Sequence, residues 1–500
     1  MNKAAPLVIL AAPSPWRSLG CAARRSAYVV LALVALWTAW YAYAARAIPA
    51  ALAASRARGE PISVEDLNPV LPPGEANAAD LCLAADAACH LSAAEEELIN
   101  PTPMGSYFGY PLNEADLTAA RRLLDSRKAT LELVRRIRTV QHAAWIVDPD
   151  DWRVTGGNLR AVRHLALFLR AMAIVQHQNR HDNEAVETLR DLLILADRVG
   201  QGPAIIHTLM ASIPATMASE TVRDLAPDLE MQSATHPSGA TPEQMRSLLG
   251  ELLDTGPAQA QLVRAYRGEQ AYLLVVAMKA IDQPAAVPMR PLLRLSVPRA
   301  LQFIDAQAAA ARAPNWPAVQ ARFPREPDRD DHLILAFTDF FLRRSIDTDR
   351  AILLPYRSRT DRVLAATRLG IREFELDHGG KIPAALAELS PIYLAAVPVD
   401  PFRADGGPIS YVPARRVLYS VGENGRDDGG TLDSTIRPPG WGRAPDAVYP
   451  LDRWTPPPPP PPPTWGPGMP PPPGAPPGWS PVPPGSPPPV TPPPGTWSPR

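Results

Sequence analysis

The sequence predicts a mainly α-helical protein with an N-terminal transmembrane helix, a body of α-helical hairpins, a small α+β C-terminal module with a β-hairpin, and a disordered Pro-rich tail. Three observations carry this prediction: an uncharged apolar run at residues 26–45, apolar residues at helical spacing from residue 113 onward, and a tail beyond Trp454 dominated by proline. The chain has 500 residues, 46% of them apolar, which is enough for two or three units with real cores.

The run SAYVVLALVALWTAWYAYAA, residues 26–45, contains no charged residue. Twenty helical residues span about 30 Å, the thickness of the hydrocarbon layer of a bilayer. Aromatic residues cluster toward its C-terminal end, as they do at membrane interfaces: Trp37, Trp40, Tyr41 and Tyr43. This segment is therefore predicted to be a single transmembrane helix, with the lipid bilayer as its partner.

Basic residues set the predicted orientation of this helix. Four of them precede it without any acidic residue: Lys3, Arg17, Arg24 and Arg25. Those that follow it are soon countered by acids: Arg46, Arg56 and Arg58 by Glu60, Glu65 and Asp66. The positive-inside rule places residues 1–25 in the cytoplasm and the bulk of the chain in the periplasm, anchored in the inner membrane.

A cleaved signal peptide is the alternative interpretation, because Ala42, Tyr43 and Ala44 satisfy the small-x-small cleavage rule. We favour the uncleaved anchor, since both the apolar run and the segment before it are long for a signal peptide. In either case most of the chain is exported.

Residues 46–112 are predicted to form a linker with short helices, and they contain Cys82 and Cys89 in the stretch CLAADAAC. An oxidising compartment allows a disulfide between them. Positions seven apart on one helix are about 10.5 Å apart, too far for a disulfide, so a bridge requires a break between the two residues. The alternative is two unpaired thiols on a short alanine-rich helix. Cys21, on the cytoplasmic side, has no evident partner.

Residues 113–360 are predicted to form the helical body. Apolar residues recur on one helical face from a cap at Asn113 to about Trp145, and a second such run starts near Leu159. Asp182 caps a third helix that ends at Gly200. A fourth helix is opened by Pro203, interrupted or kinked at Pro214 and closed by Pro227. Further helices are predicted at 242–254, 257–281, 331–354 and 360–376, separated by proline-rich joints such as VPMRPLLRLSVPRA.

The helix pair at residues 159–199 resembles a tetratricopeptide-type hairpin, with Ala185 at the position where such repeats place a small residue. The resemblance covers one hairpin, and no second copy follows at a fixed period.

Two groups of residues in the body invite a chemical interpretation. His177 and His181 are four apart, a spacing that puts two imidazoles on one helix face for a metal; the alternative is that they meet solvent and the C-terminal helix dipole. Arg264, Arg267 and Glu269 are interpreted as an internal ion pair or a solvated helix face. No nucleophile elbow, Walker loop, dinucleotide glycine pattern or HExxH motif is present, so no catalytic residue is predicted.

Residues 361–450 are predicted to form the α+β module. After a helix that ends at Gly379 and Gly380, the chain continues with a short helix AALAELS, the stretch YLAAVPVDPF, and two strands, ISYVP and RVLYSVG, that form a hairpin across Ala414 and Arg415.

The order HGGKIPAALAEL, YLAAVPVDPF, ISY, LYSVGENGRDDGG in residues 361–435 resembles the globular head of the major pseudopilin of type II secretion systems. The chain is also similar to large planctomycete-type envelope proteins in which a single-pass anchor and a helical body precede such a head. A true pilin joins its head directly to a membrane helix behind a prepilin-peptidase site. Here more than 300 residues intervene and no such site is present, so a fibre subunit is not expected.

The resemblance implies a calcium site in the loop after YSVG, because this loop binds calcium in the pseudopilin family. Carboxylate and carbonyl oxygens on a flexible turn are suitable calcium ligands. The residues implied as ligands are Asn424, Asp427, Asp428 and Asp433. Asn424 stands where the family has an acidic residue or asparagine, and Val417 stands where it often has an acid. The alternative is that Asn-Gly and Asp-Gly pairs merely turn the chain.

The tail, residues 451–500, is predicted to populate extended polyproline II conformations, either as a spacer or as a ligand for an aromatic groove. The net charge of −1 and the lack of a basic stripe with interleaved aromatic residues argue against nucleic-acid binding.

The sequence as a whole favours a membrane-anchored, exported interaction or scaffold protein of the bacterial envelope, with envelope or secretion-system proteins as partners. One alternative is an accessory component of a type II secretion or pilus-like system that docks through its pseudopilin-like head. A second alternative is an exported enzyme whose site is assembled from scattered residues.

Overall fold

The computed structural model describes residues 15–63, 66, 68, 70–99, 110–148, 152–324, 348–431 and 446–453. The described residues belong to one compact unit. They form a mainly helical protein with a three-stranded antiparallel sheet, which confirms the predicted fold class at this level. Asp433 and the proline-rich tail beyond Arg453 lie outside the described residues.

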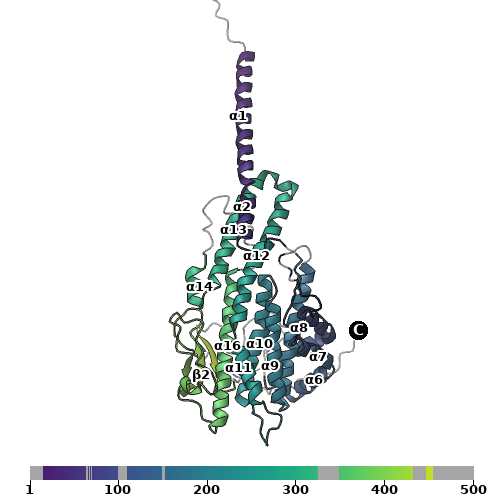
Figure 1. The fold of residues 1–500 in the computed structure, drawn as a ribbon, viewed down its shortest axis with the longest axis vertical. Helices are drawn as coiled ribbons and strands as arrows, with labels where there is room; N and C mark the ends of the chain where they lie inside the picture. The colour runs from purple at the N-terminus through teal and green to yellow at the C-terminus, as the bar shows by residue number, and fades with distance from the viewer. Residues whose placement is uncertain are drawn as a thin grey trace, which may run out of the picture. The chain divides into compact units, whose positions relative to one another are not determined.

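The chain begins with helix α1, Pro15–Ala44, which is followed after a two-residue turn by α2, Ala47–Ala57. Within the described residues, Ala23–Ala57 is the one helical segment long and apolar enough to cross a membrane, and almost none of its apolar window is buried. Its N-terminal part extends away from the helical body (Figure 1). At its other end Ala44 is completely buried, and both helices pack on α13, Arg290–Ala310.

The short helices described after α2 are α4, Ala78–Cys89; α5, Ala93–Ile99; α6, Glu114–Asp125; and α7, Lys128–Ile137. The predicted cap at Asn113 is confirmed, because its side chain accepts a hydrogen bond of 2.9 Å from the amide of Asp116. The helical pattern does not continue to Trp145, however. The chain turns between α6 and α7 and leaves helical structure after Ile137, yet Trp145 remains buried through tertiary contacts.

The helical body contains a series of adjoining helices: α8, Trp152–Gln178; α9, Asp182–Gly200; α10, Ile205–Leu225; and α11, Pro242–Leu253. The third predicted helix is confirmed from Asp182 to Gly200, although the capping position itself is His181. Pro214 does not interrupt α10, which runs through it as one helix.

The elements described in the second half of the body, outside residues 325–347, are α12, Gly256–Asp282; the 3₁₀ helix η2, Pro284–Met289; α13; α14, Trp316–Arg322; and α16, Thr348–Asp377. The stretch VPMRPLLRLSVPRA was predicted to be a joint, and this prediction is wrong. Most of it belongs to α13, where Pro291 occupies the first turn, a position that needs no amide donor. Burial of Leu293, Val297 and Leu301 offsets the cost of Pro298 inside the helix.

The small sheet has the order β1-β2-β3, with β1 at Ser410–Val412, β2 at Val417–Ser420 and β3 at Ala447–Pro450. The predicted β1–β2 hairpin is confirmed: Tyr411 faces Leu418, and the chain reverses through a 3₁₀ turn at Pro413–Arg415. Strand β3 was not predicted. It pairs with β2 so that Leu418 lies opposite Tyr449.

One hydrophobic core is shared by the body and the C-terminal module. It includes Leu165 of α8, Leu369 of α16, Leu418 of β2 and Tyr449 of β3. A second cluster joins α2, α12, α13 and α14. The boundary predicted at residue 360 lies inside α16, so the module is packed on the body along a common helix (Figure 1).

Candidate functional site

The loop after β2 was the strongest candidate for a site, and its glycines have a conformational role. Gly422, Gly425, Gly429 and Gly430 all have positive φ, between 61° and 87°, a region that other residues enter at a cost. At Gly430 a side chain would also collide with the ring of Tyr419. The glycine spacing is therefore explained by the path of the chain.

The described residues of the implied calcium site lie together in this loop, but their oxygens accept hydrogen bonds from the protein. One Asp427 oxygen accepts from the Tyr419 hydroxyl at 2.9 Å and from the Gly429 amide at 3.0 Å. Asn424 accepts from the Arg426 amide and donates to Asp428 at 2.7 Å. Among the described residues, no three His, Cys, Asp or Glu side chains converge as a metal-binding group. Calcium binding stays a prediction, because calcium also takes carbonyl oxygens as ligands and Asp433 lies outside the described residues.

Asp446 and Asp400 organise the loop, and sequence analysis missed the role of both. Asp446 is 2% exposed and accepts a hydrogen bond of 2.7 Å from the amide of Gly430. Asp400, in the VDPF stretch, is completely buried and accepts from the Ser420 hydroxyl at 2.7 Å and the Val421 amide at 2.9 Å. Burial raises the pKa of both carboxyls. Asp400 thus ties VDPF to YSVG, which gives a structural reason for the presence of both stretches.

The disulfide is not formed in the structure. Cys82 and Cys89 are both free and buried on α4, a continuous helix that keeps their seven-residue separation near 10.5 Å. Burial raises the pKa of each thiol to about 12, so both are inert as nucleophiles near neutral pH. The structure therefore agrees with the alternative prediction of two unpaired thiols on a short alanine-rich helix.

His177 and His181 do not form the metal pair that their spacing allowed. Helix α8 ends at Gln178, and Arg180 adopts a positive φ of 64°, so the two histidines do not share one helix face. His181 is exposed, whereas His177 is buried. The Nδ1 atom of His177 forms a short contact with the carboxylate of Asp182.

The buried His177 belongs to a polar cluster around a cavity of about 190 Å³. Its Nε2 atom lies 3.1 Å from the hydroxyl of Tyr110, which in turn donates to Asp228 at 3.2 Å. Arg453 forms an ion pair with Asp228, and its guanidinium lies 4.8 Å from the centre of the Tyr110 ring. Burial and the carboxylate of Asp228 raise the pKa of Tyr110 to about 12. The Tyr110 hydroxyl therefore stays protonated at neutral pH. The cluster connects segments that are far apart in the sequence, from Tyr110 to Arg453.

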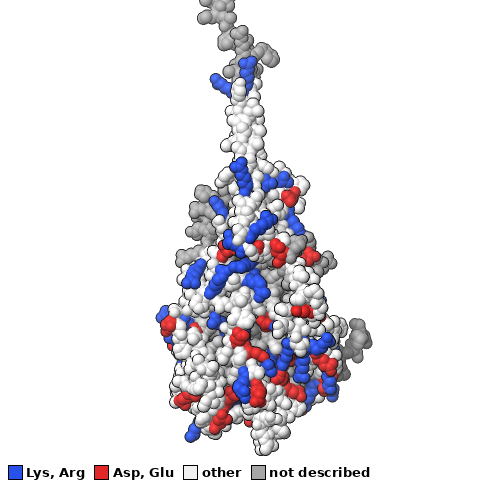
Figure 2. Space-filling view, viewed as in Figure 1, with Lys and Arg blue, Asp and Glu red and all other residues white. Residues whose placement is uncertain are grey.

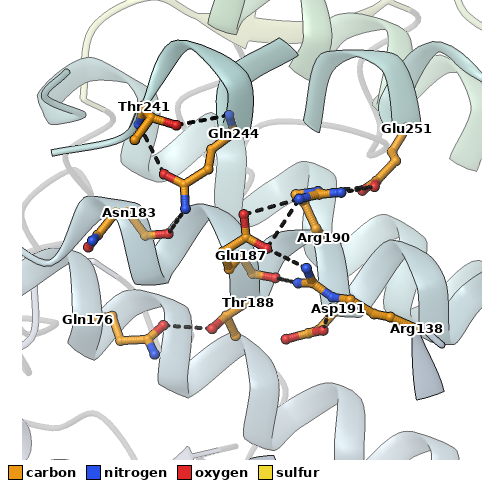
Figure 3. A network of polar contacts seen from close by, with 10 residues as sticks. All are labelled: Arg138, Gln176, Asn183, Glu187, Thr188, Arg190, Asp191, Thr241, Gln244 and Glu251. Atoms are coloured by element: carbon orange, nitrogen blue, oxygen red, sulfur yellow. Dashed lines mark hydrogen bonds and ion pairs between the residues drawn. The ribbon is translucent and has the colours of Figure 1, made fainter. Parts of the chain in front are cut away.

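A second polar network joins α7, α9 and α11 (Figure 3). Arg138 at the end of α7 contacts Glu187 and Asp191 of α9, the latter at 2.5 Å. Arg190, the residue before Asp191 on α9, contacts Glu251 of α11 at 2.7 Å. Burial raises the pKa of Asp191 to about 6, although Arg138 opposes this effect. These ion pairs hold three helices in register.

Glu269 departs from its predicted environment. It is 5% exposed on α12, whereas Arg264 of the same stretch faces solvent. Its carboxylate is hydrogen-bonded to the backbone at Ile205, the first residue of α10, and burial raises its pKa to about 7. No ion pair with Glu269 is found in the described part of the chain, so the interpretation as an ion pair or solvated face is wrong for this residue.

A cavity of about 270 Å³ lies between α9, α10, the start of α12 and α16. Leu193, Ala211 and Ala215 provide apolar walls, and Arg359 and Thr208 provide polar groups. The Thr208 hydroxyl is buried without a hydrogen-bond partner among the described residues. The cavity has the size and mixed lining of a small-molecule site at the lower end of the usual range.

No protein-family model matches the chain, and no curated protein and no solved structure matches it.

Proposed function

We propose that this protein is a membrane-anchored, exported interaction or scaffold protein of the bacterial envelope. The observation that carries the proposal is the exposed apolar surface of α1. Large apolar side chains on this helix are more than half exposed, among them Tyr28, Leu31, Leu33 and Leu36. A continuous apolar surface of this kind is unfavourable in water and is stabilised by the hydrocarbon of a bilayer.

The packing of the other end of α1 supports an uncleaved anchor over a signal peptide. Ala44 is fully buried, and the guanidinium of Arg294 on α13 lies 4.9 Å from the centre of the Tyr41 ring. Cleavage after Ala44 would remove these contacts from the folded body. Because the end of α1 is packed into the folded body, retention of α1 as an anchor is favoured over its removal as a signal peptide.

The polar clusters support a scaffold role over a catalytic one. The Tyr110–His177 cluster joins a loop, two helices and the C-terminal side of β3, and the Arg138–Glu187 network joins three helices. In both clusters the charged groups are engaged with one another. Such networks make the body a rigid support for the surfaces that meet partners.

An accessory role in a secretion or pilus-like system is the second candidate. The observation that favours it is Asp400, whose carboxylate joins the two stretches that carry the pseudopilin resemblance, VDPF and YSVG. The exposed Ile392, with 79% of its surface accessible, offers an apolar contact point on the same module.

Two experiments on the full chain test these proposals. Alkaline phosphatase, active only outside the cytoplasm, is fused to Arg500, and an N-terminal tag reports whether α1 is retained. We expect an active, tagged, membrane-bound product; activity of a cytosolic reporter at this position would contradict the exported anchor. For the second candidate, in-cell cross-linking compares Ile392→Glu with Val70→Glu, a change at another exposed apolar residue. Loss of secretion-system partners with the first variant alone supports docking through the head.

A further inference from the structure

We propose that the hairpin tip between α12 and α13, residues 278–290, lies in the lipid headgroup layer of the membrane that α1 spans, where Arg290 and Arg294 contact lipid phosphates. This inference rests on the proposed membrane anchor and adds a second, independent contact with the same bilayer. With two contacts to the same bilayer, the body has a fixed orientation relative to the membrane.

The position of the tip follows from its contacts with α1. Helix α13 packs on α1 and α2, and Arg294 lies over the ring of Tyr41 at 4.9 Å. Tyr41 is part of the aromatic end of the membrane helix, where Trp37 and Trp40 pack edge to face at 5.3 Å. Trp and Tyr mark the interface between hydrocarbon and water. A residue of α13 that contacts Tyr41 is therefore at the level of this interface.

The tip extends beyond that contact. Helix α13 begins at Arg290, four residues before Arg294, which is about 6 Å along a helix axis. The residues that precede Arg290 form the tip, which lies beside the C-terminal end of α1 (Figure 1). These residues therefore meet the headgroups of a membrane crossed by α1.

The surface of the tip is suited to this layer. Residues 283–289, QPAAVPM, carry no charge, and η2 contains no buried residue. Val287 is 45% exposed and Met278 is 40% exposed. Pro284 and Pro288 lack amide donors, which reduces the number of backbone groups that need water. Exposure of these apolar side chains is unfavourable in water, whereas contact with a bilayer surface is favourable.

Basic residues flank the uncharged segment 283–289 of the tip. Arg290 is held in place by a hydrogen bond of 2.8 Å from its Nε to the carbonyl of Ile281. Lys279 of the tip is exposed, as is Arg46 in the turn between α1 and α2, and Asp282 is the acidic residue of the tip. Figure 2 shows Lys and Arg side chains gathered where α1 joins the body. Basic residues flanking an apolar segment attract anionic lipid headgroups.

The test measures depth in the membrane with the full chain in vesicles. Val287→Cys, Ile392→Cys and Leu33→Cys are each made in a Cys21→Ser background and labelled with an environment-sensitive fluorophore; the native Cys82 and Cys89 are buried. The vesicles contain phosphatidylcholine with or without phosphatidylglycerol, and doxyl-labelled lipids quench either near the headgroups or deep in the chains.

We expect the label at residue 287 to be quenched by the shallow doxyl lipid about twofold or more above the label at residue 392, and the label at residue 33 to be quenched by the deep one. Quenching at residue 33 with none at residue 287 overturns the inference and leaves the anchor intact. Absence of quenching at residue 33 overturns the proposed anchor itself.

The contribution of the arginines is tested separately. The double variant Arg290→Gln and Arg294→Gln should reduce shallow quenching at residue 287 in anionic vesicles to its level in phosphatidylcholine. Arg246→Gln, at a side chain 69% exposed on α11, is the matched control. Equal quenching in both kinds of vesicle, unaffected by the double variant, overturns the role of phosphate contacts.

Discussion

Glu269→Gln is expected to stabilise the folded protein above pH 7 and to have little effect near pH 4. Burial raises the pKa of this carboxyl from 4.5 to about 7 in the folded state. Below pH 4.5 the group is protonated in both the folded and unfolded states. Between pH 4.5 and 7 only the unfolded state ionises, so the free energy of unfolding falls as the pH rises. Above pH 7 the loss is complete.

The size of this effect follows from the two pKa values. Each pH unit between them corresponds to about 1.4 kcal/mol, so the folded state loses about 3 kcal/mol across the interval. Glutamine has no ionisable proton, and its amide oxygen can still accept the hydrogen bond from the backbone at Ile205. The variant therefore avoids the loss.

The assay is guanidinium unfolding of the full chain in detergent micelles, followed by circular dichroism from pH 4.5 to 8.5. The difference in unfolding free energy between Glu269→Gln and the parent protein should grow with pH and level off above about pH 8. Glu114→Gln, at an exposed glutamate on α6, controls for the substitution itself. A difference that stays flat over this range, or destabilisation at pH 8, would refute the assignment of Glu269 as a buried carboxyl without a cationic partner.

Three further predictions concern the polar clusters and the glycine loop. Arg138→Ala should lower the unfolding free energy by about 3–5 kcal/mol, because it removes the ion pair of the buried Asp191 carboxylate, while Lys128→Ala at an exposed pair changes it by less than about 1 kcal/mol in the same denaturation assay. Asp446→Ala should speed hydrogen exchange at the Gly430 amide; unchanged protection there would show that this carboxylate does not hold the loop. If the implied calcium site exists, calcium should raise the melting temperature over that in chelator, and Asp427→Asn should reduce the shift; equal melting temperatures would contradict calcium binding.

Local patterns in the sequence predicted the elements that depend on neighbouring residues. The uncharged run at 26–45 predicted the long apolar helix, and Asn113 and Gly200 marked helix ends that the structure confirms. One of the two interpretations of the Gly-rich loop after YSVG, chain turns at Asn-Gly and Asp-Gly, agrees with the positive φ of Gly425 and Gly429. Each of these features depends on residues within a few positions of one another.

Features that depend on distant packing were not predicted. Helix α13 passes through a proline-rich stretch because its apolar face is buried by α12, α14, α1 and α2. Strand β3 forms because it pairs with β2, and no pattern of neighbouring residues predicts this pairing. The spacing of His177 and His181 indicated a shared face, but the helix ends between them.

By itself, the sequence determined that the chain is mainly helical, that it carries one segment apolar enough for a membrane, and where its turns need glycine, because these properties follow from local composition and backbone sterics. Only the tertiary structure decided that Glu269 is buried with no cationic partner among the described residues, that Asp400 and Asp446 hold the loop, and that the module shares one core with the body. Burial and hydrogen bonding depend on which distant surfaces meet, and that is settled when the helices pack.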